Sequence, residues 1–263
     1  MPGYSYYEAD LHLLNRKAAL RKINGNGPAA LRSQPKSTGA VSNRLKKLVS
    51  AVNRVAEGLD WEQDLQNTSC VAFDTETTGL KPFEGDEVIS IGAIVIENGL
   101  VDENMTFYRL VNPGRPQSAK SLELTGLSDE MLKKGCHIYD ALADLVEFAG
   151  PRAMIAHSAA FDLAFFNLKL GAADSRLANP VIDTALLAAA LLPPNSDFSL
   201  EGLASRFKVS LEGRHNALED AIIAARVYLN LFEELKEQKT TSLPKLARLL
   251  SGLNPQKGYP TVY

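Results

Sequence analysis

The chain has 263 residues, of which 45% are hydrophobic, and its formal net charge is −3. This length is enough to bury one full core, or one core with appendages, so we expect one enzyme-sized domain. Two cysteines exclude a disulfide framework, and no apolar run reaches the roughly 20 residues of a membrane span, so we expect no membrane partner.

The first 60 residues are basic, whereas the rest of the chain is acidic. They contain 10 Lys and Arg against 4 Asp and Glu, a charge of +6, and the remainder contains 18 against 27, a charge of −9. Their opening sequence lacks the charged-then-apolar order of a secretory signal, so we expect a cytoplasmic protein. A basic arm on an acidic body fits a nucleic-acid or acidic-protein partner, and a solvated extension is the alternative.

Residues 24–42 are rich in Gly, Pro, Ser and Asn, which predicts a flexible linker between two helix-like patches. In the second patch, apolar residues recur at three- and four-residue steps from Leu45 to Leu59, which predicts an amphipathic helix. The apolar face of this helix must bury on the main domain or on a partner. We assign residues 1–64 to a basic, partly flexible N-terminal extension.

Several β-rich runs follow this extension. Three read as consecutive strands, and two shorter ones alternate with helical segments: residues 70–74, 87–97 and 105–111, then 154–157 and 181–184. Asn98-Gly99 is a tight-turn signal, so we expect the second and third strands to form an antiparallel hairpin. The pattern predicts an α/β fold, with a mixed sheet whose first three strands are antiparallel and whose faces are covered by helices.

The last long helix is predicted from about Ala217 to Lys236, because apolar residues trace one face of it. We therefore assign residues 65–238 to the main domain. Residues 239–263 are assigned to a C-terminal tail with a short helix that has Pro244 near its start.

Two acids follow the first predicted strand in VAFDTETTGL, residues 71 to 80. Asp74 and Glu76 are two positions apart, so their side chains point to the same side of a strand. Two carboxylates about 5 Å apart repel by roughly 3 kcal/mol at an effective dielectric near 20. A shared proton, an arginine or a divalent metal would offset this repulsion, and a solvated strand end with two surface acids is the alternative.

A third acid lies in AHSAAFDLAFFN, residues 156 to 167. The segment reads as a strand that ends near His157, with Ser158 as the N-cap of a helix whose first turn carries Asp162. A helix-dipole acid is the alternative for Asp162, but the apolar residues around it, Phe161 among them, favour the rim of a cleft. We interpret His157 as structural.

The fourth acid and a histidine lie in GRHNALEDA, residues 213 to 221. Asn216 followed by Glu219 is a capping box, which predicts that a helix starts there with His215 on the preceding loop. Asp220 then falls at the end of the first turn, so His215 and Asp220 can converge on one site. In the alternative, Glu219 and Asp220 serve the helix end and His215 is an exposed loop residue.

Together, Asp74, Glu76, Asp162 and Asp220 form a candidate cluster of four carboxylates beside His215. Four acids require more than one cation, which is the arrangement of a site with two Mg²⁺ ions, or two Mn²⁺ ions, for phosphoryl transfer. A histidine, with an ordinary pKa near 6.5, is suited to accept a proton from water in such a site.

FDTETTGL, AHSAAFD and RHNALEDA resemble, in order, the three motifs of the DEDDh 3′–5′ exonucleases, the family of the proofreading epsilon subunit of bacterial DNA polymerase III. The resemblance covers about residues 68 to 235. It implies an RNase H-like fold, two Mg²⁺ ions held by the four acids, His215 as general base and stepwise release of nucleoside monophosphates from a 3′ end. A sister group has tyrosine where Asn216 stands, so the histidine type is indicated.

The resemblance also implies a groove for the 3′-terminal nucleotide. Thr77 and Gly79 match positions whose backbone approaches this nucleotide, Leu80 matches one that packs against it, and Thr125 matches one near the groove. We assign Ser158 and Phe161 to the same groove. Many members have asparagine where this chain has Ser158, and serine lacks the amide donors.

We therefore expect a 3′–5′ exonuclease that acts on single-stranded DNA or frayed duplex ends, in proofreading or repair, with a DNA polymerase or a repair complex as a possible partner. An RNA-trimming enzyme that resembles RNase T or oligoribonuclease is the first alternative. From another class, the alternative is an inactive exonuclease fold that serves as a binding subunit, although all five chemical positions are present.

Overall fold

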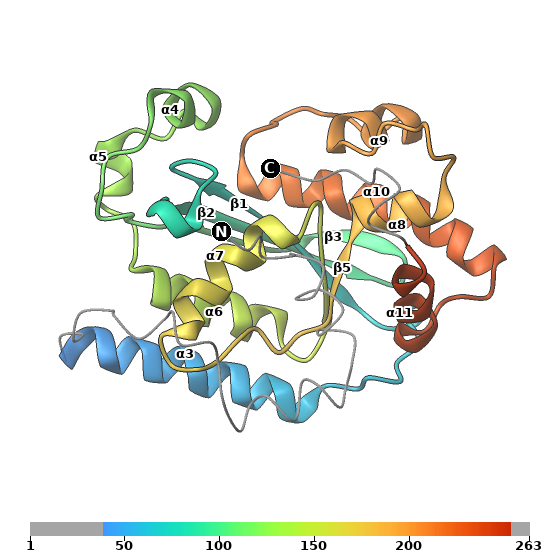
Figure 1. The fold of residues 1–263 in the computed structure, drawn as a ribbon, viewed down its shortest axis with the longest axis horizontal. Coiled ribbons are helices and arrows are strands. Elements are labelled where there is room, and N and C mark those ends of the chain that lie inside the picture. The colour runs from blue at the N-terminus through green and yellow to red at the C-terminus, as the bar shows by residue number, and fades with distance from the viewer. Residues whose placement is uncertain (1–38, 254–263) are drawn as a thin grey trace, which may run out of the picture.

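The computed structural model describes residues 39–253, which form a five-stranded mixed sheet with helices on both faces (Figure 1). The strand order is β3-β2-β1-β4-β5. The first three strands are antiparallel, whereas β4 runs parallel to β1 and β5 runs parallel to β4, so the predicted mixed sheet is confirmed. The strands are β1 (Cys70–Thr77), β2 (Val88–Glu97), β3 (Leu100–Leu110), β4 (Ala153–Ala156) and β5 (Val181–Asp183).

Two hydrophobic cores lie on the two faces of the sheet. One contains residues of α3, α6 and α7, and the other contains residues of α8, α9, α10 and α11. The helices are α3 (Gly39–Gly58), the 3₁₀ helix η2 (Pro82–Glu84), α4 (Ala119–Thr125), α5 (Asp129–Leu132), α6 (Ile138–Ala149), α7 (Ala160–Gly171), α8 (Thr184–Leu191), α9 (Leu200–Phe207), α10 (Ala217–Glu237) and α11 (Leu243–Ser251).

The central strand β1 is apolar on both sides because both faces of the sheet are covered. Val71 and Phe73 pack in the core of α6 and α7, whereas Cys70 and Ala72 pack in the core of α8 and α10. A strand buried on both faces reads as a continuous apolar run. β1 continues to Thr77, three residues beyond the predicted end, so the acids that follow the apolar run still belong to the strand.

The predicted hairpin is confirmed. Asn98 and Gly99 have φ angles of +52° and +74°, as a two-residue turn of this kind requires. β3 begins directly after this turn, five residues earlier than predicted. Residues 102–104, Asp-Glu-Asn, are polar and therefore read as a loop in the sequence. In the structure the pairing register shifts beside them, between Ile94 and Val95 of β2.

The helix predicted after the linker is α3, and its apolar face packs on α6 of the main sheet domain. Its side chain Leu48 is fully buried. α3 begins at Gly39, so the predicted linker is wrong for residues 39–42, and the remainder of that linker and the first helix-like patch lie outside the described residues.

The C-terminal helix α11 begins with Pro244 in its first turn, as predicted, and packs on the core of α8 and α10. The segment before it pairs with the segment before β1: the Leu65 backbone N–H donates to the Thr241 carbonyl at 2.8 Å, and the Leu243 N–H donates to the Gln63 carbonyl at 3.2 Å. Within residues 39–253, the helices are too short or too polar to cross a membrane.

Candidate active site

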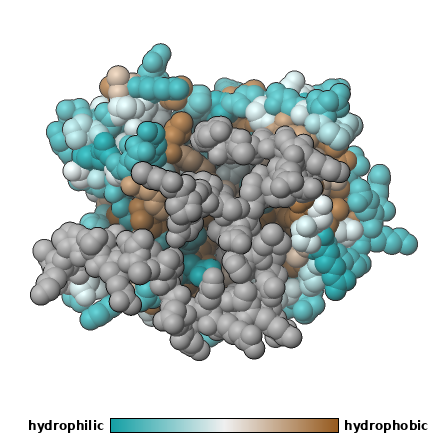
Figure 2. All heavy atoms as spheres, viewed as in Figure 1, coloured by the Kyte–Doolittle hydropathy of each residue, from teal (hydrophilic) through white to brown (hydrophobic). Residues whose placement is uncertain are grey.

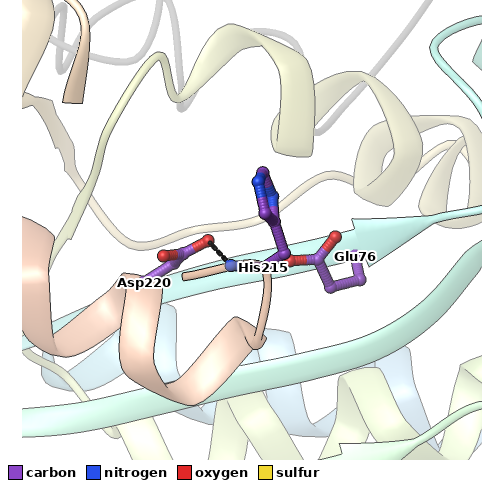
Figure 3. Close-up of side chains that lie close together, drawn as sticks. All are labelled: Glu76, His215 and Asp220. Atoms are coloured by element: carbon purple, nitrogen blue, oxygen red, sulfur yellow. Dashed lines mark hydrogen bonds between the residues drawn. The ribbon is translucent and has the colours of Figure 1, made fainter. Parts of the chain in front are cut away.

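Three of the predicted site residues meet at the end of β1. Glu76, His215 and Asp220 each offer a ligand atom, and these atoms all lie within 4.8 Å of one another. In Figure 3 the carboxylates of Glu76, from β1, and Asp220, from α10, lie on either side of His215. The structure thus brings together three residues that the sequence analysis placed in one cluster.

A glycine on β2 allows α10 to approach the sheet here. Gly92 pairs with Asp74 across β1 and β2, and a Cβ atom on Gly92 would lie only 2.2 Å from the backbone nitrogen of Leu218. Only glycine therefore fits between this strand and the first turn of α10. The close approach places Asp220 beside the acids of β1.

The N-terminus of α10 orients His215 and Asp220. The side chain of Asn216 accepts a hydrogen bond from the Leu218 N–H, so Asn216 caps the helix and His215 lies on the loop, as predicted. His215 has a φ of +67°, an uncommon conformation for a residue with a side chain. Its backbone N–H donates to Asp220 Oδ2 at 3.2 Å, which ties this loop to the acid.

Asp162 reaches the same region from the first turn of α7. It is 2% exposed, and the hydroxyl group of Thr75 donates a hydrogen bond to its Oδ1 atom. Asp74 and Asp162 lie outside the group of three ligand atoms within 4.8 Å. They belong to the same electrostatic cluster, because burial and then the charge of Asp162 raise the pKa of Asp74.

Burial and mutual repulsion disfavour the charged forms of these acids. Burial raises the pKa of Asp74, and the charges of Asp162, Asp220 and Glu76 raise it further. Burial, followed by the charge of Asp220, raises the pKa of Glu76 to about 7, and burial raises the pKa of Asp162 to about 7. The full negative charge of the cluster at neutral pH therefore requires compensating cations.

Asp220 offers the clearest sign that these residues can hold a cation. Its Oδ2 atom accepts hydrogen bonds from the Arg214 guanidinium and the His215 N–H, whereas its buried Oδ1 atom has no hydrogen-bond partner among the described residues. Buried acceptors without partners are rare because they cost free energy. A carboxylate-rich set of donors with an unpaired oxygen fits hard divalent cations such as Mg²⁺ or Mn²⁺.

The prediction that Ser158 is the N-cap of α7 is wrong. α7 is preceded by Ala159, and Ser158 has a φ of +57°. The backbone N–H groups of Ser158 and Ala159 donate instead to the Asp183 carboxylate, at 3.0 and 2.9 Å. Asp183, at the end of β5 and 25 residues away, thus accepts hydrogen bonds from the N–H groups of this turn. The serine hydroxyl is therefore not needed as a cap.

Asp183 is a residue that the sequence analysis missed. It also accepts hydrogen bonds from the N–H groups of Ala185 and Leu186 at the start of α8, at 2.8 and 3.3 Å. One buried carboxylate thus joins the turn before α7 to the turn before α8. The signal in the sequence was an acid at the end of a strand directly before a helix, the position of an N-cap.

The segment after Glu76 is fixed by its own hydrogen bonds. The Thr77 hydroxyl donates to the Gly79 carbonyl at 2.7 Å, and the Thr77 carbonyl accepts from the Ser121 hydroxyl of α4 at 2.8 Å. A Cβ atom on Gly79 would lie 2.4 Å from the Asp86 carboxylate, so a side chain there would displace this carboxylate from the Lys81 N–H. Leu80 is 60% exposed and is therefore accessible to a ligand.

The remaining residues assigned to a groove are less exposed. The Thr125 hydroxyl donates to the Ser121 carbonyl at 2.9 Å and accepts from the Leu127 N–H, so it is engaged within its own segment. Phe161 is half-buried and packs edge-on against Phe165 with ring centroids 5.2 Å apart.

His157 has the environment of a structural residue. Its Nδ1 atom lies 2.9 Å from the Thr184 hydroxyl, at the start of α8. Burial lowers the pKa of His157 to about 4, so the ring is neutral at physiological pH. A neutral ring that bridges β4 and α8 agrees with our interpretation of it as structural.

A mixed sheet with this strand order and a carboxylate cluster at the end of its central strand defines a nuclease of the RNase H-like class. A family described as Exonuclease matches residues 71–228, and this span includes all four acids and His215. The chain belongs to this exonuclease family, and its recognition as a DEDDh 3′–5′ exonuclease is confirmed.

Curated relatives include two kinds of protein named for DNA polymerase III. The chain is 37% identical over 183 residues to a DNA polymerase III subunit epsilon-like protein of Rhodobacter capsulatus, which covers 69% of this chain and 26% of the relative. It is 35% identical over 206 residues to a PolC-type DNA polymerase III of Thermotoga petrophila, which covers 77% of this chain and 15% of the relative. The chain thus spans about a quarter or less of these relatives.

Solved structures share the fold at low sequence identity. Exonuclease X in complex with 5′ overhanging duplex DNA has a TM-score of 0.55 at 22% identity, over 69% of this chain and 99% of that chain. The nuclease domain of 3′hExo, a DEDDh family member bound to rAMP, has a TM-score of 0.56 at 15% identity, over 65% of this chain and 94% of that chain. These likenesses confirm the RNase H-like fold.

Proposed function

We propose that this chain hydrolyses phosphodiester bonds at the 3′ ends of single-stranded or frayed DNA and releases nucleoside monophosphates, with two Mg²⁺ ions as cofactors. The observation that carries the proposal is the convergence of Glu76, His215 and Asp220, with Asp74 and Asp162 beside them. They surround a buried carboxylate oxygen that has no hydrogen-bond partner within residues 39–253. Family membership supports a hydrolase that depends on divalent metal, and Mg²⁺ is our choice because its donors here are carboxylate oxygens.

We assign the metal ligands to Asp74, Glu76, Asp162 and Asp220. When bound, two divalent cations supply positive charge to the attacking and leaving oxygens of the scissile phosphate. Thr75 holds the Asp162 carboxylate through its hydroxyl group, and the N–H of His215 holds Asp220. These contacts keep the ligands oriented before a cation arrives.

His215 is assigned as the general base. Its loop position beside both Glu76 and Asp220 places an imidazole nitrogen within the cluster, where it can accept a proton from the attacking water. Thr77, Gly79 and Leu80 then bind the terminal nucleotide, through the backbone of the fixed segment and the exposed leucine side chain. Thr125, Ser158 and Phe161 complete the proposed groove.

The names of the relatives favour DNA as the substrate. They are a polymerase III subunit epsilon-like protein and PolC-type polymerases, so we also propose a polymerase or repair complex as the partner, and proofreading or repair in the cytoplasm as the setting. RNA trimming is the second candidate, because 3′hExo shares the fold and was captured with rAMP.

The test uses the full chain with 5′-labelled single-stranded oligonucleotides of one sequence, as DNA and as RNA, in Mg²⁺. We expect a ladder that descends from the 3′ end, faster on DNA, and abolished both by EDTA and by Asp74→Asn. A faster ladder on RNA would transfer the assignment to RNA trimming. Binding of both strands without a ladder would support the inactive binding subunit and overturn the proposal.

We keep the division into residues 1–64, 65–238 and 239–263 as a proposal. The packing of α3 on α6 and of α11 on the core of α8 and α10 ties both flanks to the central domain. We propose that residues 1–64 act through their excess of Lys and Arg, which binds nucleic acid.

A further inference from the structure

An arginine side chain reaches the carboxylate cluster in addition to His215. Arg214 lies on the loop between α9 and α10, directly before His215, and its guanidinium donates to Asp220 Oδ2. Within residues 39–253, it is the only Lys, Arg or His side chain that forms an ion pair with any of the four acids of the cluster. Its side chain is 23% exposed and that of Asp220 is 4% exposed, so solvent screens this pair only partly.

Arg214 has a second acidic partner outside the cluster. Its Nε and Nη2 atoms both donate to Glu201 Oε1, in the first turn of α9. Glu201 is half exposed, at 51%, and is not one of the four acids. The guanidinium therefore lies between two carboxylates, one inside the cluster and one at its edge.

The contact with Asp220 weakens if Asp220 binds a divalent cation through its free Oδ1 atom. Asp220 Oδ2 already accepts from the guanidinium and the His215 N–H, so a metal ion on Oδ1 would place a second positive charge on the same carboxylate, where it repels the guanidinium. Glu201, in contrast, stays available as a partner for Arg214 when the cluster is filled, because it lies outside the proposed ligand set.

We propose that Arg214 is a resident cation that holds Asp220 in the metal-free enzyme and is released toward Glu201 when divalent metal binds, so that the Arg214–Glu201 pair sets the metal affinity of the site. This inference rests on the proposed function, because it assumes that Asp220 is a metal ligand. Arg214 is a positioning residue: it keeps the cluster assembled and competes with the metal for the negative charge of the Asp220 carboxylate.

The structure gives a physical reason for such a residue. Burial raises the pKa of Asp220 above its ordinary value, and the nearby guanidinium opposes this shift. Without a cation, the four acids would become protonated or would separate. The guanidinium carries one positive charge, whereas two divalent ions carry four. It therefore offsets only part of the repulsion among the acids, and metal ions can still displace it.

The test measures Mn²⁺ binding by calorimetry and the melting temperature in EDTA and in Mn²⁺, with the full-length protein. We expect Arg214→Gln to bind Mn²⁺ about tenfold more tightly than wild type. This factor corresponds to an ion pair whose strength lies between those of exposed pairs and fully buried pairs. In EDTA this variant should melt at a lower temperature than wild type, because the cluster has lost its cation. Saturating Mn²⁺ should remove most of that difference.

Glu201→Gln tests whether Glu201 acts on the metal site through Arg214 or through its own charge. Loss of Glu201 leaves Asp220 as the partner of Arg214, so we expect Mn²⁺ to bind several-fold more weakly than in wild type. The double variant with Arg214→Gln should bind Mn²⁺ as Arg214→Gln does, because Glu201 acts through Arg214. Additive effects in the double variant would overturn the proposal, since they would mean that each charge acts on the metal directly.

Arg226→Gln is the matched control, because it removes an arginine of α10 that pairs with Glu103 away from the cluster, at 3.2 Å. It should leave Mn²⁺ affinity unchanged. Wild-type protein that binds no Mn²⁺ would contradict the proposed function itself. Wild-type protein that binds Mn²⁺, with Arg214→Gln no tighter, would overturn only the role of Arg214.

Discussion

Four carboxylates with raised pKa values lie at the end of β1, and the first cause of each shift is burial. A carboxyl group whose pKa is raised in the folded protein binds a proton more tightly there than in the unfolded chain. Its favourable contribution to stability is complete below the unfolded pKa, near 4, and is lost as pH rises through the folded pKa. For Glu76 and Asp162 that folded pKa is about 7.

We therefore predict that the free energy of unfolding in EDTA falls as pH rises from about 5 to about 7.5. Saturating Mg²⁺ should remove this fall, because bound cations stabilise the charged carboxylates. Asp74→Asn should flatten the dependence in EDTA, because it removes one buried acid and its repulsion of the others. Denaturant titrations at fixed pH values measure all three, and an unchanged slope in Asp74→Asn would contradict the shared cluster.

His215 has a separate prediction, because its proposed role is chemical. His215→Ala should lower kcat by at least about a hundredfold and abolish the acid limb of the pH–rate profile. Mn²⁺ binding, measured by calorimetry, should be retained, since the four acids remain. A profile with the same acid limb in His215→Ala would show that another group accepts the proton.

At the scale of elements, the site depends on how closely α10 approaches β2. Gly92→Ala would place a Cβ atom 2.2 Å from the Leu218 backbone, so α10 must move away from Asp74. We predict a loss of about 1–3 kcal/mol of stability and a large loss of nuclease activity and Mn²⁺ affinity. The control is Gly99→Ala, where a Cβ atom meets nothing within 4 Å and only turn strain increases.

α3 belongs to the packed structure, although it lies in the segment that we assigned to the extension. Its Leu48 is fully buried in the core with α6, so deletion of residues 1–60 would expose apolar surface. Deletion of residues 1–38 keeps every described contact and removes 6 Lys and Arg against 2 Asp and Glu, a charge of +4.

We predict that the protein without residues 1–38 cleaves a dinucleotide at the wild-type rate but binds long single strands more weakly, with a smaller dependence on salt. Fluorescence anisotropy at several salt concentrations measures the binding. Equal binding of long strands by both proteins would exclude a role for this charge, and loss of dinucleotide cleavage would show that the segment supports the fold.

At the scale of the molecule, the sequence predicted those parts of the site that follow from local geometry. Asp74 and Glu76 share a face because strand side chains alternate, and His215 lies outside α10 because Asn216 caps it. The contacts between distant segments could not be predicted in this way. Ser158 is an example, because its backbone N–H donates to the carboxylate of Asp183, which lies at the end of another strand.

The same limit applies to the contacts that assemble the cluster. The Thr75 hydroxyl on Asp162 joins β1 to α7, and the guanidinium of Arg214 on Asp220 joins a loop to α10. Gly92 reads as an unremarkable strand residue until α10 is seen against it. Local pattern thus gave the residues of the site, whereas tertiary packing determines their distances and charges.

The hydropathy of one face of the molecule is mixed, with apolar and polar residues side by side between the grey segments (Figure 2). A surface of this kind does not reveal which residues act. Function in this protein is therefore assigned to the cluster, whose acids we propose to hold divalent cations.

The most direct test is anomalous diffraction from crystals of the full chain soaked with Mn²⁺ and a nucleoside monophosphate. We predict two Mn²⁺ peaks about 3.5–4 Å apart, ligated by Asp74, Glu76, Asp162 and Asp220, with His215 facing the phosphate. Crystals that bind the nucleotide but show no Mn²⁺ peak at these carboxylates would contradict the account.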